Sequence, residues 1–328
     1  MPSRHFEQPV LHYAGRMRAA GDLTLKLPNL LIVGVAKAAT TSLFQYLAQH
    51  PDIFPAEHKE LRYFTPLRYE EPLPPIGTYL SHFQKWSTER YAVEATPGYF
   101  PGGQAVAEGI DQTLPGAKVI LSLRDPRDRC WSYFRFMKSR VRIPQDMDFD
   151  TYLDRCEELH RQGIDGARKH QPFWGLGGGC YANWLPSWAD VFGNRLYVLF
   201  FEDLIAAPET AVTGICRWLD LDPAPVATFD FATDNKSEQY HRKPLQLAAL
   251  SLNRRAERFF SRHRRLKRTL KRIYHATNAD EPERKQQPSS SAWARLDDFY
   301  RPYTLELSNQ LRQLGVTQQP AWLAQSPR

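Results

Sequence analysis

Long apolar runs and closely spaced cysteines are both missing from this sequence of 328 residues. No run of about 18 consecutive apolar residues occurs, so we expect no transmembrane helix. Residues 1–28 scatter charged side chains and lack the apolar stretch of a secretory signal. The four cysteines, at positions 130, 156, 180 and 216, are too far apart for a zinc knot or a CxxC redox pair. We therefore expect reduced thiols and a cytoplasmic location.

Acidic residues are fewer than basic residues, and the excess of basic residues is unevenly distributed along the chain. The chain has 43 Lys and Arg against 36 Asp and Glu, which gives a net charge of +7. Residues 254–272 hold ten Lys or Arg and one acid, so this segment carries +9 and the rest of the chain carries −2. The high positive charge is therefore a property of one segment and does not characterise the whole chain.

The basic segment 254–272 belongs to a stretch with helical periodicity. Leu252, Phe259, Leu266 and Ile273 recur at every seventh position, which predicts an amphipathic helix with a cationic outer face. Three interpretations stay open: a cap helix with a solvated face, a contact with an anionic acceptor or an anionic membrane, and nucleic-acid binding. Aromatic residues for stacking are sparse there and no known binding module accompanies them, so we expect no nucleic-acid partner.

Short apolar runs alternate with amphipathic stretches along most of the chain. We expect strands at residues 29–34, 91–94, 118–123 and 195–201. We expect helices at 40–49, 104–113, 149–162, 181–192, 209–219 and 293–314, and one that follows the third strand and ends near 138. This alternation predicts an α/β fold with a parallel sheet that helices cover on both faces.

We expect three regions in a single domain. Residues 1–27 form an N-terminal arm and residues 28–222 form the core. Residues 223–328 supply a basic helical cap, a polar mobile loop and a closing C-terminal helix.

The first chemical motif reads GVAKAATTS and spans residues 34–42, directly after a predicted strand and at the start of a predicted helix. Backbone N–H groups at a helix N-terminus and the helix dipole favour an anion. Small side chains let the backbone approach closely, hydroxyls add donors and a lysine adds a cation. We therefore predict a phosphate-binding loop made by Lys37, Ala38, Ala39, Thr40, Thr41 and Ser42. The alternative is an ordinary turn with a solvated lysine.

The second motif reads RDPRDRCWSYF and begins at Arg124, the residue that follows the third predicted strand. An arginine fork donates two hydrogen bonds to a phosphate monoester, and this motif places Arg124, Arg127, Arg129 and Ser132 close together in sequence. We interpret Arg127 as part of a solvated helix face. We interpret Arg129 as a structural ion-pair partner of Asp125 or Glu94.

The two motifs resemble those of sulfotransferases that depend on 3′-phosphoadenosine 5′-phosphosulfate (PAPS). KELRYF at 59–64, EATPGY at 94–99, GCY at 179–181 and VLFFEDL at 198–204 extend the resemblance. It covers residues 28–222, and residues 296–314 more weakly, and it is nearest to the heparan-sulfate and bacterial carbohydrate or small-molecule branch. It implies a P-loop-like parallel sheet flanked by helices, PAPS as cofactor with PAP as product, and no metal.

The resemblance implies a role for each matched residue. Arg124 and Ser132 would hold the 3′-phosphate, and Lys37 would stabilise charge on the leaving phosphate. Glu60 would be the base that deprotonates an acceptor hydroxyl on a carbohydrate, a lipid or a small-molecule natural product. Asn235, Lys236 and Ser237 would close over the 3′-phosphate side; the alternative is a solvated turn.

Two assignments in this site stay open. His58 is the alternative base, because an extended segment would put it on the same face as Glu60. Glu60 could instead form a salt bridge with Lys59 or Arg62. Tyr181 either contacts the cofactor or acceptor or belongs to the core.

The sequence departs from the family pattern at two positions. Many members have Gly where this chain has Ala39, which demands more backbone restraint. Several heparan-type enzymes have Lys where this chain has Ala95, which disfavours a glycosaminoglycan acceptor. Two other functions stay open: a P-loop kinase, disfavoured because GK[ST] is missing, and a non-catalytic nucleotide-binding adaptor.

Overall fold

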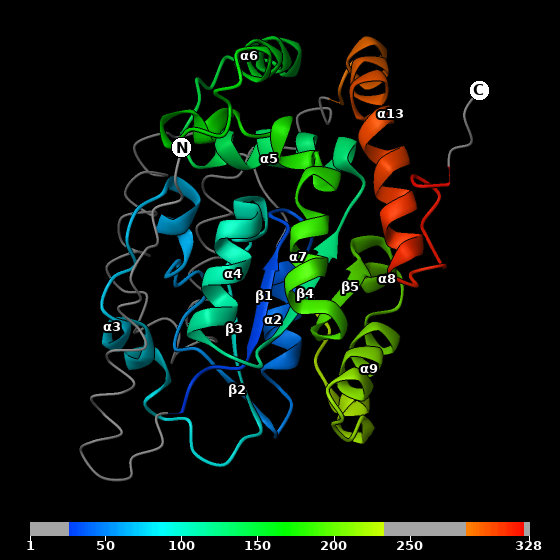
Figure 1. The fold of residues 1–328 in the computed structure, drawn as a ribbon. Helices are drawn as coiled ribbons and strands as arrows, with labels where there is room; N and C mark the ends of the chain where they lie inside the picture. The colour runs from blue at the N-terminus through cyan, green and yellow to red at the C-terminus, as the bar shows by residue number, and fades with distance from the viewer. Residues whose placement is uncertain (1–25, 233–286, 325–328) are drawn as a thin grey trace, which may run out of the picture.

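The computed structural model describes residues 26–232 and 287–324, and its centre is a five-stranded parallel sheet (Figure 1). The strand order is β2-β3-β1-β4-β5, and every neighbouring pair is parallel. The strands are β1 (Leu30–Gly34), β2 (Ile53–Pro55), β3 (Tyr91–Ala95), β4 (Lys118–Leu123) and β5 (Leu196–Phe200). The predicted α/β fold with a P-loop-like parallel sheet is confirmed.

Helices follow or precede each strand, as the sequence predicts. They are α2 (Thr40–Leu47), α3 (Ile76–Leu80), α4 (Gly103–Thr113), α5 (Pro126–Ser139), α6 (Phe149–Arg161), α7 (Leu185–Phe192), α8 (Phe201–Ala206), α9 (Pro208–Trp218) and α13 (Ser290–Gln313). The sequence reasoning missed β2, which has only three residues, α3, which has five, and α8, which follows β5 directly. The predicted basic helix at 254–272 lies outside the described residues.

The apolar strands are buried on both faces because helices cover both sides of the sheet. Leu31 and Val33 of β1 contribute to one core with side chains of α4 and α7, whereas Leu30 and Ile32 contribute to the other with α2 and α9. Successive side chains of a strand point to opposite faces. This explains why β1 reads as a continuous apolar run, which is typical of parallel sheets.

A third apolar cluster lies beyond the carboxyl ends of the strands. Its members come from α5, α6 and the first half of α13, and include Tyr133, Phe149, Tyr152 and Tyr300. In Figure 1, α5 and α6 lie past the arrowheads of the strands. The chain leaves β1 toward β2 on one side of the sheet and leaves β4 toward β5 on the other. Ligands of open α/β sheets bind at such a switch point.

None of the helices within residues 26–232 and 287–324 has the length and hydropathy that a membrane crossing requires. The longest, α13, has 24 residues and carries charged side chains such as Asp297, Arg301 and Arg312.

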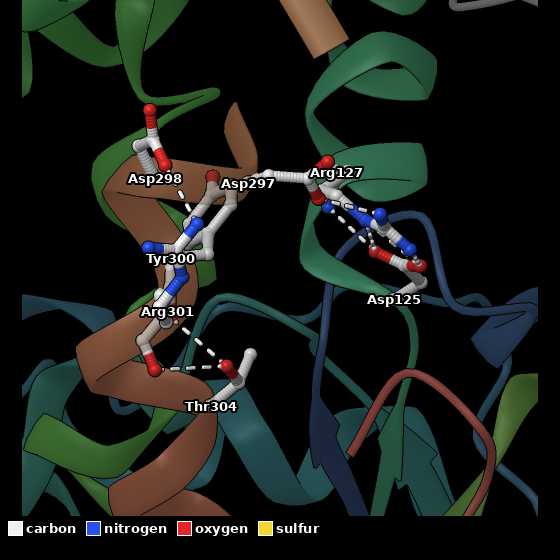
Figure 2. A network of polar contacts seen from close by, with 7 residues as sticks. All are labelled: Asp125, Arg127, Asp297, Asp298, Tyr300, Arg301 and Thr304. Atoms are coloured by element: carbon white, nitrogen blue, oxygen red, sulfur yellow. Dashed lines mark hydrogen bonds and ion pairs between the residues drawn. The ribbon is translucent and has the colours of Figure 1, made fainter. Parts of the chain in front are cut away.

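Arg127 ties the start of α5 to α13, and the prediction of a solvated helix face was wrong. One end of its guanidinium contacts Asp125 at 2.6 Å and the other contacts Asp297 at 2.5 Å (Figure 2). The Arg127 side chain is 27% exposed. It is thus Arg127 that pairs with Asp125, whereas Arg129 is fully buried and donates to the carbonyl oxygen of Gly175.

We predict that Arg127→Gln lowers the free energy of unfolding by roughly 2 kcal/mol, because it leaves the buried Asp125 carboxylate without its ion pair. The matched control is Asp297→Asn, which removes the partner at the more exposed end, where 41% of the side chain is accessible. An exposed pair contributes less than about 1 kcal/mol. Urea denaturation of both variants measures the difference, and equal losses would contradict this assignment.

Candidate functional site

The loop that follows β1 is held against β4 by main-chain contacts. The N–H of Val35 donates to the carbonyl of Ser122 at 2.8 Å, and the Ser122 hydroxyl donates to the carbonyl of Ala38 at 2.8 Å. At Gly34 an added Cβ would lie 2.7 Å from Cβ of Phe100, so only glycine fits at the point where the strand ends. The predicted phosphate-binding loop therefore has a fixed path across the carboxyl edge of β1 and β4.

Two residues of this loop have left-handed backbones. Lys37 has φ 77° and Ala39 has φ 53°. Ala39 is the N-cap residue of α2, and an alanine side chain has no acceptor for the first amides of that helix. The positive φ at Ala39 explains why glycine suits this position. It also means that the alanine backbone is held in a conformation that a Cβ disfavours, as expected from the sequence.

Lys37 lies among other cations. Burial, and the positive charges of Arg124, Arg135, Arg140 and Lys59, lower the pKa of Lys37 to about 8. Its ammonium lies 4.5 Å from the centre of the Phe136 ring. Because these charges repel one another, an anion bound among them would relieve the repulsion.

Lys59 is a site residue that the sequence reasoning missed. Its ammonium donates to the hydroxyls of Thr40 at 3.0 Å and Thr41 at 2.8 Å, so it crosses from the KELRYF segment to the start of α2. Burial lowers its pKa to about 8. The signal available in the sequence was its place beside Glu60 in the matched KE element.

Arg124 extends from the end of β4 to the same loop. Its guanidinium donates to the carbonyl of Lys37 at 3.0 Å and packs over the Phe201 ring at 4.2 Å. Its Nε is buried and has no hydrogen-bond partner among the described residues. Tyr181 is buried and donates its hydroxyl to the Arg124 carbonyl at 2.9 Å, as expected of the core alternative. Ser132 is half-buried on α5.

Glu60 lies at the rim of the site with its carboxylate partly exposed. Its side chain is 43% exposed and pairs with the Arg62 guanidinium at 2.6 Å, which is the salt bridge that the sequence left open. Glu60 and Arg62 have left-handed φ values of 62° and 58°, so this segment is not extended and the argument for His58 on the same face fails. The His58 ring instead meets that of His82, with centroids 4.5 Å apart.

A buried carboxyl group supports the segment that carries Glu60. Backbone N–H groups at residues 60, 62 and 64 donate to the carbonyl of Ala95, the hydroxyl of Thr96 and the hydroxyl of Tyr99. Thr96 in turn donates to the carboxyl of Glu94 at 3.4 Å. Glu94 is completely buried, and burial raises its pKa to about 8. The EATPGY element is therefore a platform for the KELRYF segment, with Glu94 neutral at pH 7.

Asn235, Lys236 and Ser237 lie outside the described residues, so their predicted part in cofactor binding stays a prediction.

We predict that Ala39→Gly raises the free energy of unfolding by about 0.5–1 kcal/mol, because glycine adopts a left-handed backbone without the penalty that a Cβ incurs. The matched control is Ala38→Gly at the neighbouring buried residue, which has no positive φ and is expected to lose stability. Urea denaturation compares the two variants. A loss of stability in Ala39→Gly that equals the loss in Ala38→Gly would argue against strain at this position.

We predict from the raised pKa of Glu94 that the free energy of unfolding falls as the pH rises. Its folded pKa of about 8 lies above the ordinary value of 4.5, so between these pH values the unfolded chain releases a proton that the folded chain keeps. The free energy of unfolding should then decrease by up to about 1.4 kcal/mol per pH unit and level off above pH 8. Glu94→Gln should remove this slope. Denaturation curves from pH 5 to pH 9 test it, and parallel pH profiles would contradict it.

Comparisons with known proteins agree with the resemblance to sulfotransferases. A model of the sulfotransferase family matches residues 76–225, which include the segment that begins at Arg124. Heparan sulfate N-deacetylase/N-sulfotransferase 1 of Caenorhabditis briggsae, a bifunctional protein, is 26% identical over 208 residues, 62% of this chain and 24% of that protein. A membrane-associated sulfotransferase of Dictyostelium discoideum is 30% identical over 154 residues, 45% of this chain and 32% of that protein. The chain thus spans about a quarter to a third of these relatives.

The fold also has a counterpart among solved structures. A sulfotransferase from Alicyclobacillus acidocaldarius aligns with a TM-score of 0.54 and 24% sequence identity, over 72% of this chain and 95% of that chain. This structural likeness shows that the two proteins share a fold. The family model and the relatives match this chain in sequence. The resemblance to sulfotransferases that the motifs indicate is therefore found again in a family match over residues 76–225 and in sequence relatives.

Proposed function

We propose that this chain transfers the sulfonyl group of PAPS to an acceptor hydroxyl on a carbohydrate, a lipid or a small-molecule natural product. The proposal depends on one observation. Lys37, Lys59 and Arg124 converge on the loop that joins β1 to α2, at the edge of the sheet between β1 and β4. A phosphate or sulfate group is the kind of ligand that such a loop and such cations favour.

The residues present fit the two ends of this cofactor. The buried Nε of Arg124 lacks a hydrogen-bond partner among the described residues, and a phosphate oxygen would supply one. We propose that Arg124 and Ser132 hold the 3′-phosphate. The backbone of residues 37–42 and the hydroxyls of Thr40, Thr41 and Ser42 would hold the 5′-phosphosulfate. Lys59 fixes two of those hydroxyls by its hydrogen bonds.

The cofactor, when bound, supplies the sulfonyl group. Glu60 would take the proton of the acceptor hydroxyl as the new S–O bond forms, and its partly exposed carboxylate can be reached from solvent. The salt bridge with Arg62 holds this carboxylate in position. Lys37 would donate a hydrogen bond to the oxygen that leaves with the phosphate as the old S–O bond breaks.

The lowered pKa of Lys37 suits this role. With a pKa of about 8 the ammonium holds its proton less tightly than an exposed lysine does, so it is a better hydrogen-bond donor to developing negative charge. Binding of an anionic group would raise this pKa again and stabilise the protonated form.

Two further proposals concern the chain as a whole. Residues 28–222 form the catalytic core, and residues 223–328 belong to the same domain, because α13 packs through Leu307 and Leu311 into the core with α4 and α7. We also propose a cytoplasmic location, with which the four cysteines agree, since all four are buried and free.

The test is transfer of label from radiolabelled PAPS and from ATP to a panel of hydroxyl-bearing acceptors. We expect label from PAPS only, with Lys37→Ala lowering kcat by about 100-fold or more. Glu60→Gln should lower kcat by about 100-fold or more while PAP affinity stays nearly unchanged.

The control is Glu108→Gln, because that carboxylate contacts Gln104 on α4 and has no part in the site. It should keep full activity. Transfer from ATP instead would support the kinase alternative, and PAP binding without transfer to any acceptor would support the adaptor alternative. Either result would overturn the proposed reaction.

A further inference from the structure

Two histidines and a glutamate gather beside the proposed active site. Glu57 and His58 follow β2, and His82 lies in the short 3-10 helix η2 (Ser81–Phe83). One ligand atom from each residue lies within 4.8 Å of the other two. Within residues 26–232 and 287–324, this is the group of three that meets such spacing.

The backbone holds the two segments in register. The N–H of Glu57 donates to the carbonyl of His82 at 3.1 Å, and the N–H of Ala56 donates to the carbonyl of Val93 in β3 at 2.8 Å. The neighbouring Phe83 is buried in the core, which anchors η2. The His58 and His82 rings meet edge to face at an interplanar angle of 81°. The fold therefore holds the backbones that carry these three side chains close together.

The donor set selects a class of metal ion. Two imidazole nitrogens and one carboxylate oxygen suit Zn²⁺ and related divalent transition metals, whereas Mg²⁺ and Ca²⁺ prefer oxygen donors alone. In a tetrahedral site with bonds of about 2.0–2.2 Å, neighbouring ligand atoms are about 3.3–3.6 Å apart. The Glu57 oxygen and His82 Nδ1 are 4.0 Å apart, and the Glu57 side chain is 52% exposed, so it can close this gap.

We propose that Glu57, His58 and His82 form a binding site for one divalent transition-metal ion of the Zn²⁺ class, with water at the fourth position. The site is separate from the transfer reaction and does not depend on it, because its ligands take no part in the phosphate loop. Its structural effect would be to join the segment after β2 to η2. His58 precedes Glu60 by two residues, so the bound ion would fix the path of the chain into the proposed base.

The test uses the full chain after treatment with EDTA and dialysis into metal-free buffer. Titration with ZnCl₂ by calorimetry, and with CoCl₂ by visible absorption, should show one equivalent bound with the spectrum of a tetrahedral Co²⁺ site. His58→Ala, His82→Ala and Glu57→Gln should each weaken Zn²⁺ binding by about 10-fold or more. Affinity should fall as the pH is lowered, because protons compete with the metal ion for its ligands.

The matched control is His160→Gln, because His160 contacts Asp165 at 2.7 Å on a different part of the molecule and should leave Co²⁺ binding unchanged. Glu57→Gln replaces an exposed side chain, so it tests the site even if a histidine variant fails to fold. Binding that is absent in the parent chain, or that is the same in the parent chain and in Glu57→Gln and His82→Ala, would overturn the proposal.

Discussion

Buried positive charge at the edge of the sheet between β1 and β4 is the constraint on which the proposed site depends. Lys37 and Lys59 are both buried enough for their pKa values to fall to about 8, and Arg124 adds a fixed cation beside them. Such a cluster lowers the stability of the folded chain unless an anion binds there. This cost is the physical reason for our proposal that an anionic cofactor binds at this edge.

The surrounding structure keeps these cations in place. The loop after β1 is hydrogen-bonded to Ser122, the Arg124 carbonyl accepts from the buried Tyr181, and Lys59 is fixed by two threonine hydroxyls. Glu94 and its neighbours support the segment that presents Glu60. These groups need not touch a substrate to matter, because a site that acts by positioning charge depends on how rigidly its residues are held.

Much of the fold could be predicted because its strands are continuous apolar runs. The turn at residues 34–39 and the helix after it could be predicted because their residues are consecutive in sequence. Contacts between distant segments could not. The ion pair of Arg127 with Asp297 joins residues that are 170 positions apart in sequence. The hydrogen bonds of Lys59 with Thr40 and Thr41 likewise join two different segments, so neither contact could be inferred from neighbouring residues. The repulsion of Lys37 by Arg135 and Arg140 likewise exists only once α5 is folded over the loop.

The most direct measurement is a crystal structure of the full chain with PAP. The account predicts the 5′-phosphate within hydrogen-bond distance of the backbone of residues 37–42 and of Lys37. It predicts the 3′-phosphate on Arg124, with its buried Nε as one donor. PAP bound at another edge of the sheet, or bound with both phosphates away from Lys37 and Arg124, would contradict the account.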